Sequence, residues 1–302
     1  MSTLTVFTPL YNRINTLKRT YESLKRQTSK DFVWLIIDDG STDNPYEIIK
    51  EWIKINNGFE IKYVYKENGG MHTAHNTAYE NIDTELNVCV DSDDYMPYNA
   101  VQLIIDCWNK NKNKGYAGII ALDFADSTKK VIGKELPTDK ESTTLMGYYN
   151  NGGFGDKKLI YRTDIIKQTP PYPVFDNEKY VALAYKYHLI DEKYELKILN
   201  ECVCIVDYQM DGSSTNMYRQ YVRNPKGFAF WRKEQMKHSI NTKQKIKACI
   251  HYVSSSLIAK NKHFIKESPE KFLTVLSIPL GFLLKIIVVK KSKSSYMKVE
   301  GI

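Results

Sequence analysis

Short apolar runs alternate with amphipathic stretches over the first 110 residues of the chain. Each run consists of apolar or β-branched residues, ends in a polar turn, and is followed by apolar positions at helical spacing. The pattern predicts strands over residues 3–9, 32–37, 61–65 and 86–90, and helices over 15–27, 46–55, 72–79 and 99–109. Such alternation favours an α/β fold: a Rossmann-like mixed, mainly parallel sheet flanked by helices.

The pattern becomes less regular after residue 126. It predicts a strand over 158–161, a helix over 180–189 and a long strand over 197–208, and it contains no internal repeat. We therefore expect one compact domain over residues 1–235. A basic, amphipathic and apolar helical region over residues 236–302 is expected to follow it as an appendage.

Two apolar segments lie in this C-terminal region. The first is a stripe at helical spacing among lysines, formed by Ile246, Ile250, Val253, Leu257 and Ile258. The second, residues 272–289, has the length of a marginal membrane span. A spanning helix would place Lys285 in hydrocarbon, at a cost of about 2.5–3.5 kcal/mol. We therefore expect helices that lie in the membrane interface. Packing on the body or a homodimer contact is the alternative.

The net charge of +8 is concentrated in the same region. Residues 241–302 contain 12 lysines and 3 glutamates, a charge of +9, so residues 1–240 carry −1. A body without basic excess argues against a nucleic-acid partner.

The five cysteines form no CxxC pair and fit a reducing compartment. The first residues do not resemble a signal peptide, which predicts a cytoplasmic body.

Acidic residues follow two of the predicted strands. Asp91, Asp93 and Asp94 come after one strand, and their hard oxygens suit Mn²⁺ or Mg²⁺. A solvated turn that caps the next helix is the simpler alternative. Asp38 and Asp39 follow another strand. A carboxylate there can accept hydrogen bonds from a nucleobase or ribose, or belong to a turn that caps a helix.

Four motifs occur in order along the chain: TPLYNR from residue 8, IDDGSTD from 37, KENGGMHTAHN from 66 and VDSDD from 90. Together they resemble the family 2 glycosyltransferases, inverting enzymes with a glycosyltransferase A fold. The resemblance is strong over residues 3–125. It continues more weakly through 175–181, 199–216 and 221–228, as in bacterial enzymes that build cell-surface polysaccharides.

The resemblance implies roles for matching residues. Pro9 and Tyr11 would line the nucleotide pocket, and Asp38 or Asp39 would contact the uracil or ribose. Asp93 would hold the metal on the donor diphosphate. Asp91 would lie near the ribose and donor sugar and could also serve as a metal ligand. The residues so assigned to donor binding are Pro9, Tyr11, Asp38, Asp39, Asn68, Gly70, Asn76, Asp91 and Arg219. Many members carry Arg-Asn where this chain has His75-Asn76.

A catalytic base is expected from the resemblance at a later helix start. Glu178 is the preferred residue, and Asp176 is the runner-up. General-base catalysis needs one carboxylate within reach of the acceptor hydroxyl. Both residues could instead only favour a helix N-terminus. Residues 211–214 are expected to form a loop over the donor diphosphate.

The implied reaction is an inverting transfer from a UDP-linked sugar to a hydroxyl of a saccharide or lipid-linked saccharide. A metal-dependent enzyme of this kind would work as a peripheral protein on the cytoplasmic membrane face, bound through its C-terminal region. Two other functions are weighed. A nucleotidyltransferase normally opens with a glycine-rich phosphate loop, which TPLYNR is not. A non-catalytic, membrane-associated glycan-binding scaffold would not need both Asp93 and Glu178.

Overall fold

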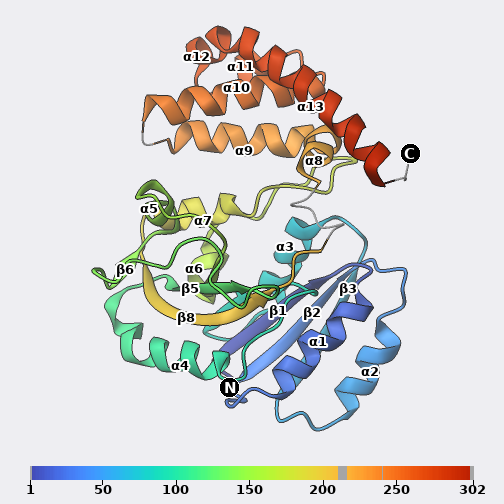
Figure 1. The fold of residues 1–302 in the computed structure, drawn as a ribbon, viewed down its shortest axis with the longest axis vertical. Coiled ribbons are helices and arrows are strands. Elements are labelled where there is room, and N and C mark those ends of the chain that lie inside the picture. Colours follow the sequence, from blue (N-terminus) through green and yellow to red (C-terminus); the bar gives the residue numbers. More distant parts are fainter. Residues whose placement is uncertain (1, 210–215, 240, 300–302) are drawn as a thin grey trace. The chain divides into compact units, whose positions relative to one another are not determined.

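The computed structural model describes residues 2–209, 216–239 and 241–299, without the side chains of 294–299. By packing, the chain divides into two compact units. Unit 1 comprises Met1–Pro171 and Lys186–Gln209, and unit 2 comprises Tyr172–Tyr185 and Met210–Ile302. Figure 1 follows the chain through both. The chain thus passes between the units three times. The sequence suggested a single boundary at residue 235, between a catalytic domain and a C-terminal region. That division by function stays a prediction.

Unit 1 is built on an eight-stranded sheet with the order β3-β2-β1-β4-β7-β5-β8-β6. Its strands are β1 (Leu4–Leu10), β2 (Phe32–Asp39), β3 (Glu60–Lys66), β4 (Leu86–Cys89), β5 (Gly118–Ala125), β6 (Ser142–Thr143), β7 (Lys157–Arg162) and β8 (Leu196–Val206). The β1–β2, β2–β3, β1–β4 and β5–β8 pairs are parallel, and the pairs β4–β7, β5–β7 and β6–β8 are antiparallel. The predicted mixed α/β architecture is confirmed.

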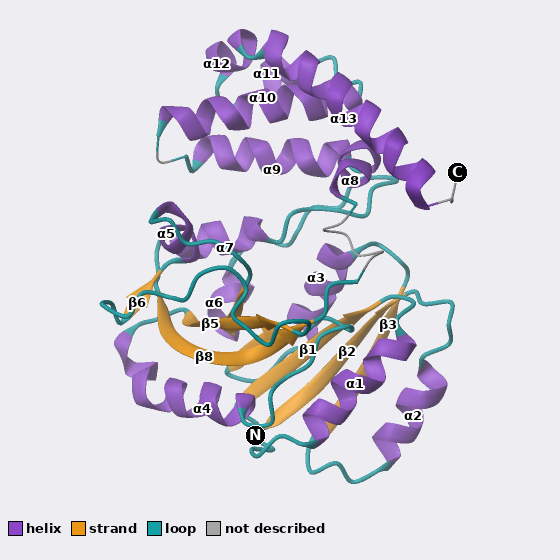
Figure 2. Ribbon diagram, viewed as in Figure 1, coloured by secondary structure: helices purple, strands orange, loops and turns teal. Residues whose placement is uncertain are grey.

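Helices flank this sheet on both faces (Figure 2). They are α1 (Ile14–Lys25), α2 (Tyr46–Lys54), α3 (Met71–Asn81), α4 (Ala100–Asn111), the 3₁₀ turn Lys112–Lys114, α5 (Leu145–Asn150), α6 (Thr163–Gln168) and α7 (Ala184–Asp191).

The helix predicted over 180–189 begins at Ala184, four residues later than predicted. Within unit 2, Lys179 N–H donates to Asn224 Oδ1 at 2.7 Å, and Gly227 lies close against the Tyr180 carbonyl. These contacts hold the segment outside a helix.

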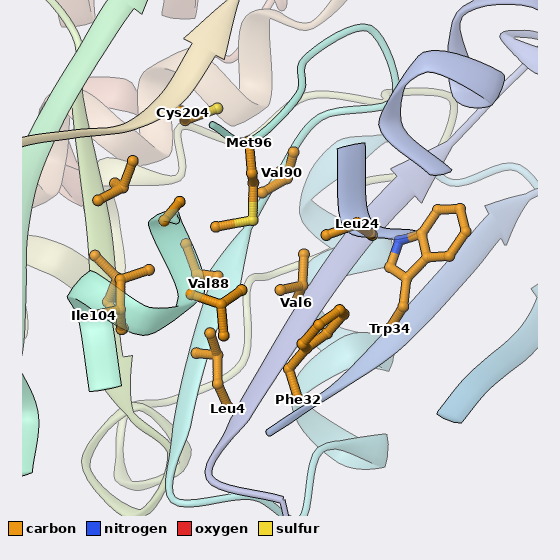
Figure 3. Close-up of a cluster of buried hydrophobic side chains, with 14 of the residues drawn as sticks. Leu4, Val6, Leu24, Phe32, Trp34, Val88, Val90, Met96, Ile104 and Cys204 are labelled. Carbon is orange, nitrogen blue, oxygen red and sulfur yellow. The ribbon is translucent and has the colours of Figure 1, made fainter. Parts of the chain in front are cut away.

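The core shows why the strands read as continuous apolar runs. Side chains of Leu4, Val6 and Trp34 lie on one face of the sheet among residues of α1, α2 and α4 (Figure 3). Phe7 lies on the other face, with its ring edge-on to His75 of α3 at 4.9 Å. Both faces of the sheet are covered, so polar side chains occur mainly at the ends of the strands. The acidic residues lie at these ends.

Two buried histidines of α3 make the unit sensitive to acid. Burial lowers the pKa of His72 to about 4 and of His75 to about 3. Within the described part of the chain, neither ring nitrogen of His72 has a hydrogen-bond partner. Both folded-state pKa values lie below the ordinary value of about 6.5, so the unfolded chain binds more protons as the pH falls. Stability is therefore complete above about pH 6.5 and is lost as the pH falls towards 4.

We expect each of these histidines to lower the free energy of unfolding by about 3 kcal/mol between pH 7 and pH 4, which is about 6 kcal/mol for the pair. Urea unfolding at several pH values measures it. His75→Gln should reduce the dependence by about half, whereas the exposed His263→Gln should leave it unchanged. A stability that is constant over this range in the unchanged protein would contradict the expectation.

Unit 2 confirms the helical C-terminal appendage. It contains α8 (Met217–Arg223), α9 (Pro225–Lys237), α10 (Thr242–Ile258), α11 (Phe264–Glu267), α12 (Lys271–Leu276) and α13 (Ile278–Val299). Of the predicted stripe of α10, Val253 is fully buried, Ile250, Leu257 and Ile258 are half-buried, and Ile246 is 39% exposed. The stripe therefore packs in part within this unit, and its contact with a membrane stays a prediction. Among the described helices, none has the length and apolarity needed to cross a bilayer.

Candidate donor-binding site

The candidate site lies where the strand order of the sheet reverses. β1 has β2 on one side and β4 on the other, and all three are parallel. Loops that leave their carboxyl ends in opposite directions open a crevice, the usual ligand site of such sheets. Tyr11 follows β1, the loop 91–94 follows β4, and Asp38 and Asp39 are the last two residues of β2. The structure thus brings the predicted donor residues of β1, β2 and β4 to one edge.

Asp39 organises the loop after β3. Its carboxylate accepts hydrogen bonds from Gly69 N–H at 2.9 Å, from Gly70 N–H at 2.7 Å and from the Lys66 ammonium. The Asn68 amide donates to the Asp39 carbonyl at 2.8 Å. At Gly40, where φ is +76°, a Cβ would lie 2.7 Å from Asn68 N, so glycine allows this close approach. Asn68 and Gly70 are therefore held in a loop that Asp39 fixes.

Asp38 has partners as well. It accepts from Ser41 N–H at 2.8 Å and from the Tyr63 hydroxyl at 2.6 Å. Burial and the neighbouring Asp38 raise the pKa of Tyr63, which keeps its hydroxyl a donor. Both aspartates are almost fully buried. Neither is singled out for the nucleoside by these contacts, and that choice stays open.

The loop after β1 presents one aromatic ring to solvent. Tyr11 is 48% exposed, whereas Pro9 is buried within the strand. Asn12 adopts φ +51° and accepts from Thr42 N–H at 2.7 Å. Asp43 accepts from Ile14 N–H at 3.0 Å and so caps α1, not the helix that follows it in sequence. These bonds join the β1 and β2 loops and fix the position of Tyr11.

The acidic loop after β4 contains one buried, hydrogen-bonded carboxylate and two that are partly exposed. Asp94 is buried and accepts from Asp207 N–H at 3.1 Å. Arg19 donates to the Asp93 carbonyl at 2.6 Å and to the Asp207 carboxylate at 2.7 Å. The side chains of Asp91 and Asp93 remain partly exposed. Burial, and then the charge of Asp91, raises the pKa of Asp93. A divalent cation would offset that repulsion.

The donor set fits Mn²⁺ or Mg²⁺ only in part. Among the described residues, no group of three or more His, Cys, Asp or Glu side chains could hold a metal ion. Asp91 and Asp93 supply two carboxylates. Mg²⁺ commonly binds through one or two carboxylates and completes its shell with water and substrate phosphates. The residues therefore suit an ion that a diphosphate brings with it.

Lys158 is a residue that the sequence reasoning missed. It lies on β7, and its ammonium is 3.6 Å from the Asp123 carboxylate of β5. Burial alone would lower the pKa of Lys158, but the carboxylates of Asp123, Asp94 and Asp91 outweigh it and raise that pKa. Burial raises the pKa of Asp123 to about 6. A lysine at the start of the predicted strand 158–161 was the available signal.

The predicted base, Glu178, lies in unit 2, where its carboxylate accepts hydrogen bonds from the backbone. Both oxygens of Glu178 are occupied: one accepts from Lys226 N–H at 2.9 Å and the other from Gly227 N–H at 2.8 Å. These groups belong to the first turn of α9, so Glu178 caps that helix. Burial raises the pKa of Glu178, and the two N–H donors act in the opposite direction. Asp176 is exposed.

The remaining predicted residues are more scattered. Asn76 is half-buried in the second turn of α3, and Arg219 is half-buried in α8 of unit 2. Residues 211–214, expected over the diphosphate, lie outside the described residues. An open hollow at the amino end of β4, lined by Glu85, Trp108 and Arg162 among others, lies at the opposite edge of the sheet from the acidic loops.

Two solved structures with similar folds contain bound nucleotide-linked sugars. S. aureus TarS, residues 1–349 in complex with UDP-GlcNAc, matches 98% of this chain and 92% of its own, with a TM-score of 0.63 and 16% identity. The mannosyltransferase PcManGT from Pyrobaculum calidifontis, in complex with GDP-Man and Mn²⁺, matches 94% and 86%, with a TM-score of 0.55 and 14% identity. The fold is that of the glycosyltransferase A class.

The family follows from sequence. The profile described as Glycosyl transferase family 2 matches residues 5–169, more than half of the chain, and the chain belongs to that family. An uncharacterized glycosyltransferase of Rickettsia conorii is 30% identical over 148 residues, which are 47% of this chain and 24% of that protein. Chondroitin synthase of Pasteurella multocida is 33% identical over 109 residues, 36% of this chain and 11% of that protein. The chain thus spans less than a quarter of the length of these relatives.

Proposed function

We propose that this chain transfers a sugar from a UDP-linked donor to a hydroxyl acceptor, with inversion at the anomeric carbon. The observation that supports it most is the crevice at the reversal of strand order, where Asp91 and Asp93 face solvent beside the exposed Tyr11. The loop fixed by Asp39 and the ring of Tyr11 suit a nucleoside, and the two carboxylates suit a cation on its diphosphate.

In the proposed reaction, Asp93, assisted by Asp91, would hold Mn²⁺ or Mg²⁺. When bound, such an ion offsets the charge of the departing nucleoside diphosphate. Arg19 keeps Asp93 in place through its main-chain carbonyl. Asn76 and Arg219 are retained as proposed donor contacts, on the family resemblance alone.

We further propose that Asp176, not Glu178, removes the proton of the acceptor hydroxyl. Each oxygen of Glu178 accepts one backbone N–H bond, and these two bonds act to lower its pKa and hold its carboxylate against α9, although each oxygen keeps a second lone pair. Asp176 is two residues away and exposed. In this proposal, the bonds of Glu178 to the first turn of α9 hold the segment around residue 178 in place, and this positions Asp176.

The acceptor proposed is a saccharide or lipid-linked saccharide of a bacterial cell-surface polysaccharide, met at the cytoplasmic membrane face. The names of two relatives, the chondroitin and hyaluronan synthases of Pasteurella multocida, support polysaccharide assembly. No observation favours nucleotidyl transfer or a non-catalytic scaffold over this function.

A screen of nucleotide sugars tests the proposal. Thermal shift and slow hydrolysis would be measured for UDP- and GDP-linked sugars with Mn²⁺, Mg²⁺ or EDTA. We expect a UDP sugar with Mn²⁺ or Mg²⁺ to raise the melting temperature and to release UDP, and EDTA to remove both effects. Stabilisation by GDP sugars alone would overturn the UDP assignment. No response to any nucleotide sugar would overturn the function.

A further inference from the structure

The surface of α12 and α13 has an unusual composition. From residue 271 to 293, the limit of the described side chains, every exposed position is either apolar or lysine, and none is acidic. The apolar members are Phe272, Val275, Leu276, Pro279, Leu280, Phe282, Leu283, Ile286 and Ile287, and the lysines are Lys271, Lys290, Lys291 and Lys293. We call this set the lysine-bordered apolar face. The six exposed apolar positions of α13 fall on one side of that helix by helical spacing, and monomeric proteins rarely expose apolar surface of this kind without a partner.

The direction of this face is set by packing inside unit 2. Gly281, Val288 and Ser292 of α13 are buried. At Gly281 a Cβ would lie 2.5 Å from Val253 of α10, so the two helices approach too closely for a larger residue. Leu283 and Ile287 lie on the opposite side of the helix, since they are shifted from Gly281 and Val288 by roughly half a turn. The helix therefore cannot rotate to bury them.

Lysines mark the borders of the face. Lys271 opens α12, and Lys290, Lys291 and Lys293 follow the last exposed isoleucine of α13. Lys285, on the flank, places its ammonium 6.0 Å from the ring centre of Phe282. Long lysine side chains can lie along an apolar surface while their ammonium groups reach water or phosphate.

We propose that the lysine-bordered apolar face docks on the surface of an anionic lipid bilayer. Its apolar side chains would enter the boundary between headgroups and acyl chains, and its lysines would meet the lipid phosphates. A protein partner fits less well, because lysine is depleted from protein interfaces. This inference names the lipid class and the contact residues for the membrane association proposed above, and it does not rest on sugar transfer.

Sedimentation of the full chain with vesicles tests the proposal, without nucleotide sugar. Vesicles of phosphatidylcholine alone would be compared with vesicles containing about one third phosphatidylglycerol. We expect binding to the anionic vesicles, at least tenfold weaker binding to the neutral ones, and weakening by 0.5 M NaCl. The variant Leu283→Asp/Ile287→Asp should bind the anionic vesicles at least tenfold less. The matched control Ile55→Asp alters an exposed isoleucine of unit 1 and should bind as the unchanged protein does.

A second variant separates charge from apolar insertion. Lys271→Gln/Lys290→Gln/Lys293→Gln should remove most of the preference for anionic vesicles and the salt dependence. Melting temperatures close to that of the unchanged protein would show that the variants are folded. Equal vesicle binding by the unchanged protein and the Leu283→Asp/Ile287→Asp variant would overturn the proposal. So would a dimer in solution that this variant converts to a monomer, because the face would then be a contact between two copies. Nucleotide-sugar hydrolysis, measured without vesicles, reports separately on the proposed function.

Discussion

Replacing Asp93 by asparagine is expected to reduce sugar transfer by about a thousandfold or more. The effect is large because the carboxylate would hold the cation that offsets charge on the leaving diphosphate, and such electrostatic contributions reach several kcal/mol. The fold should survive, since Arg19 binds the main-chain carbonyl of residue 93 and not its side chain. Initial rates at saturating donor and metal measure the loss.

A matched variant controls for a general effect of losing one negative charge. Asp106 is exposed on α4, and its carboxylate accepts from Gln102 of the same helix at 2.8 Å. Asp106→Asn should retain full activity. Asp93→Asn should also lose the melting-temperature increase that UDP and Mn²⁺ give together. Unchanged transfer by Asp93→Asn would remove this residue from the metal site.

The second large effect is expected at Asp176. Asp176→Asn should lower kcat by about 10²- to 10⁴-fold, the usual contribution of a general base, while leaving donor binding and melting temperature unchanged. Glu178→Gln should behave differently. An amide cannot accept from both Lys226 and Gly227 N–H groups, so the variant should lose about 1–3 kcal/mol of stability.

The two variants therefore distinguish catalysis from positioning. Urea unfolding and steady-state kinetics would be measured for both, with exposed Asp139→Asn as the control. If Glu178→Gln lost its turnover with no loss of stability, and Asp176→Asn kept full activity, the base would be Glu178 after all. Partial rescue of Glu178→Gln at low temperature would agree with a role in positioning.

The fold of the first 110 residues was predictable because local pattern and tertiary structure agree there. β1, β2 and β4 are largely apolar runs ended by polar residues, β3 alternates charged and apolar residues at its start, and the helices between them show clear periodicity. β5 was not predicted, although GIIALDFA is almost entirely apolar, because no helix or turn signal framed it. Its neighbours β7 and β8 come from 40 and 80 residues later, and sequence pattern holds no information about such pairings.

The sequence placed the candidate residues at the ends of strands but did not indicate their contacts. Short motifs pointed to Asp39 and Asp93, yet nothing in them indicates that Asp39 accepts hydrogen bonds from Lys66 at the end of β3 and from Gly69 and Gly70 in the loop after it. Likewise, the run before α7 gave no hint that Glu178 caps a helix 49 residues later. The ion pair between Lys158 and Asp123 depends on antiparallel pairing of β7 and β5, which no local rule supplies.

The discontinuity of unit 2 has a consequence for how a cell makes this protein. Residues 172–185 leave the ribosome well before the helix they pack on, since Glu178 binds Gly227, 49 residues further along. At ordinary elongation rates of about 5–20 residues per second, that segment waits roughly 2–10 s for its partner. During this interval Val181, which is 2% exposed in the finished fold, lacks its contact with Gly227 of α9. Premature termination anywhere from residue 186 to 225 would remove that contact permanently, so truncated products should be aggregation-prone and quickly degraded.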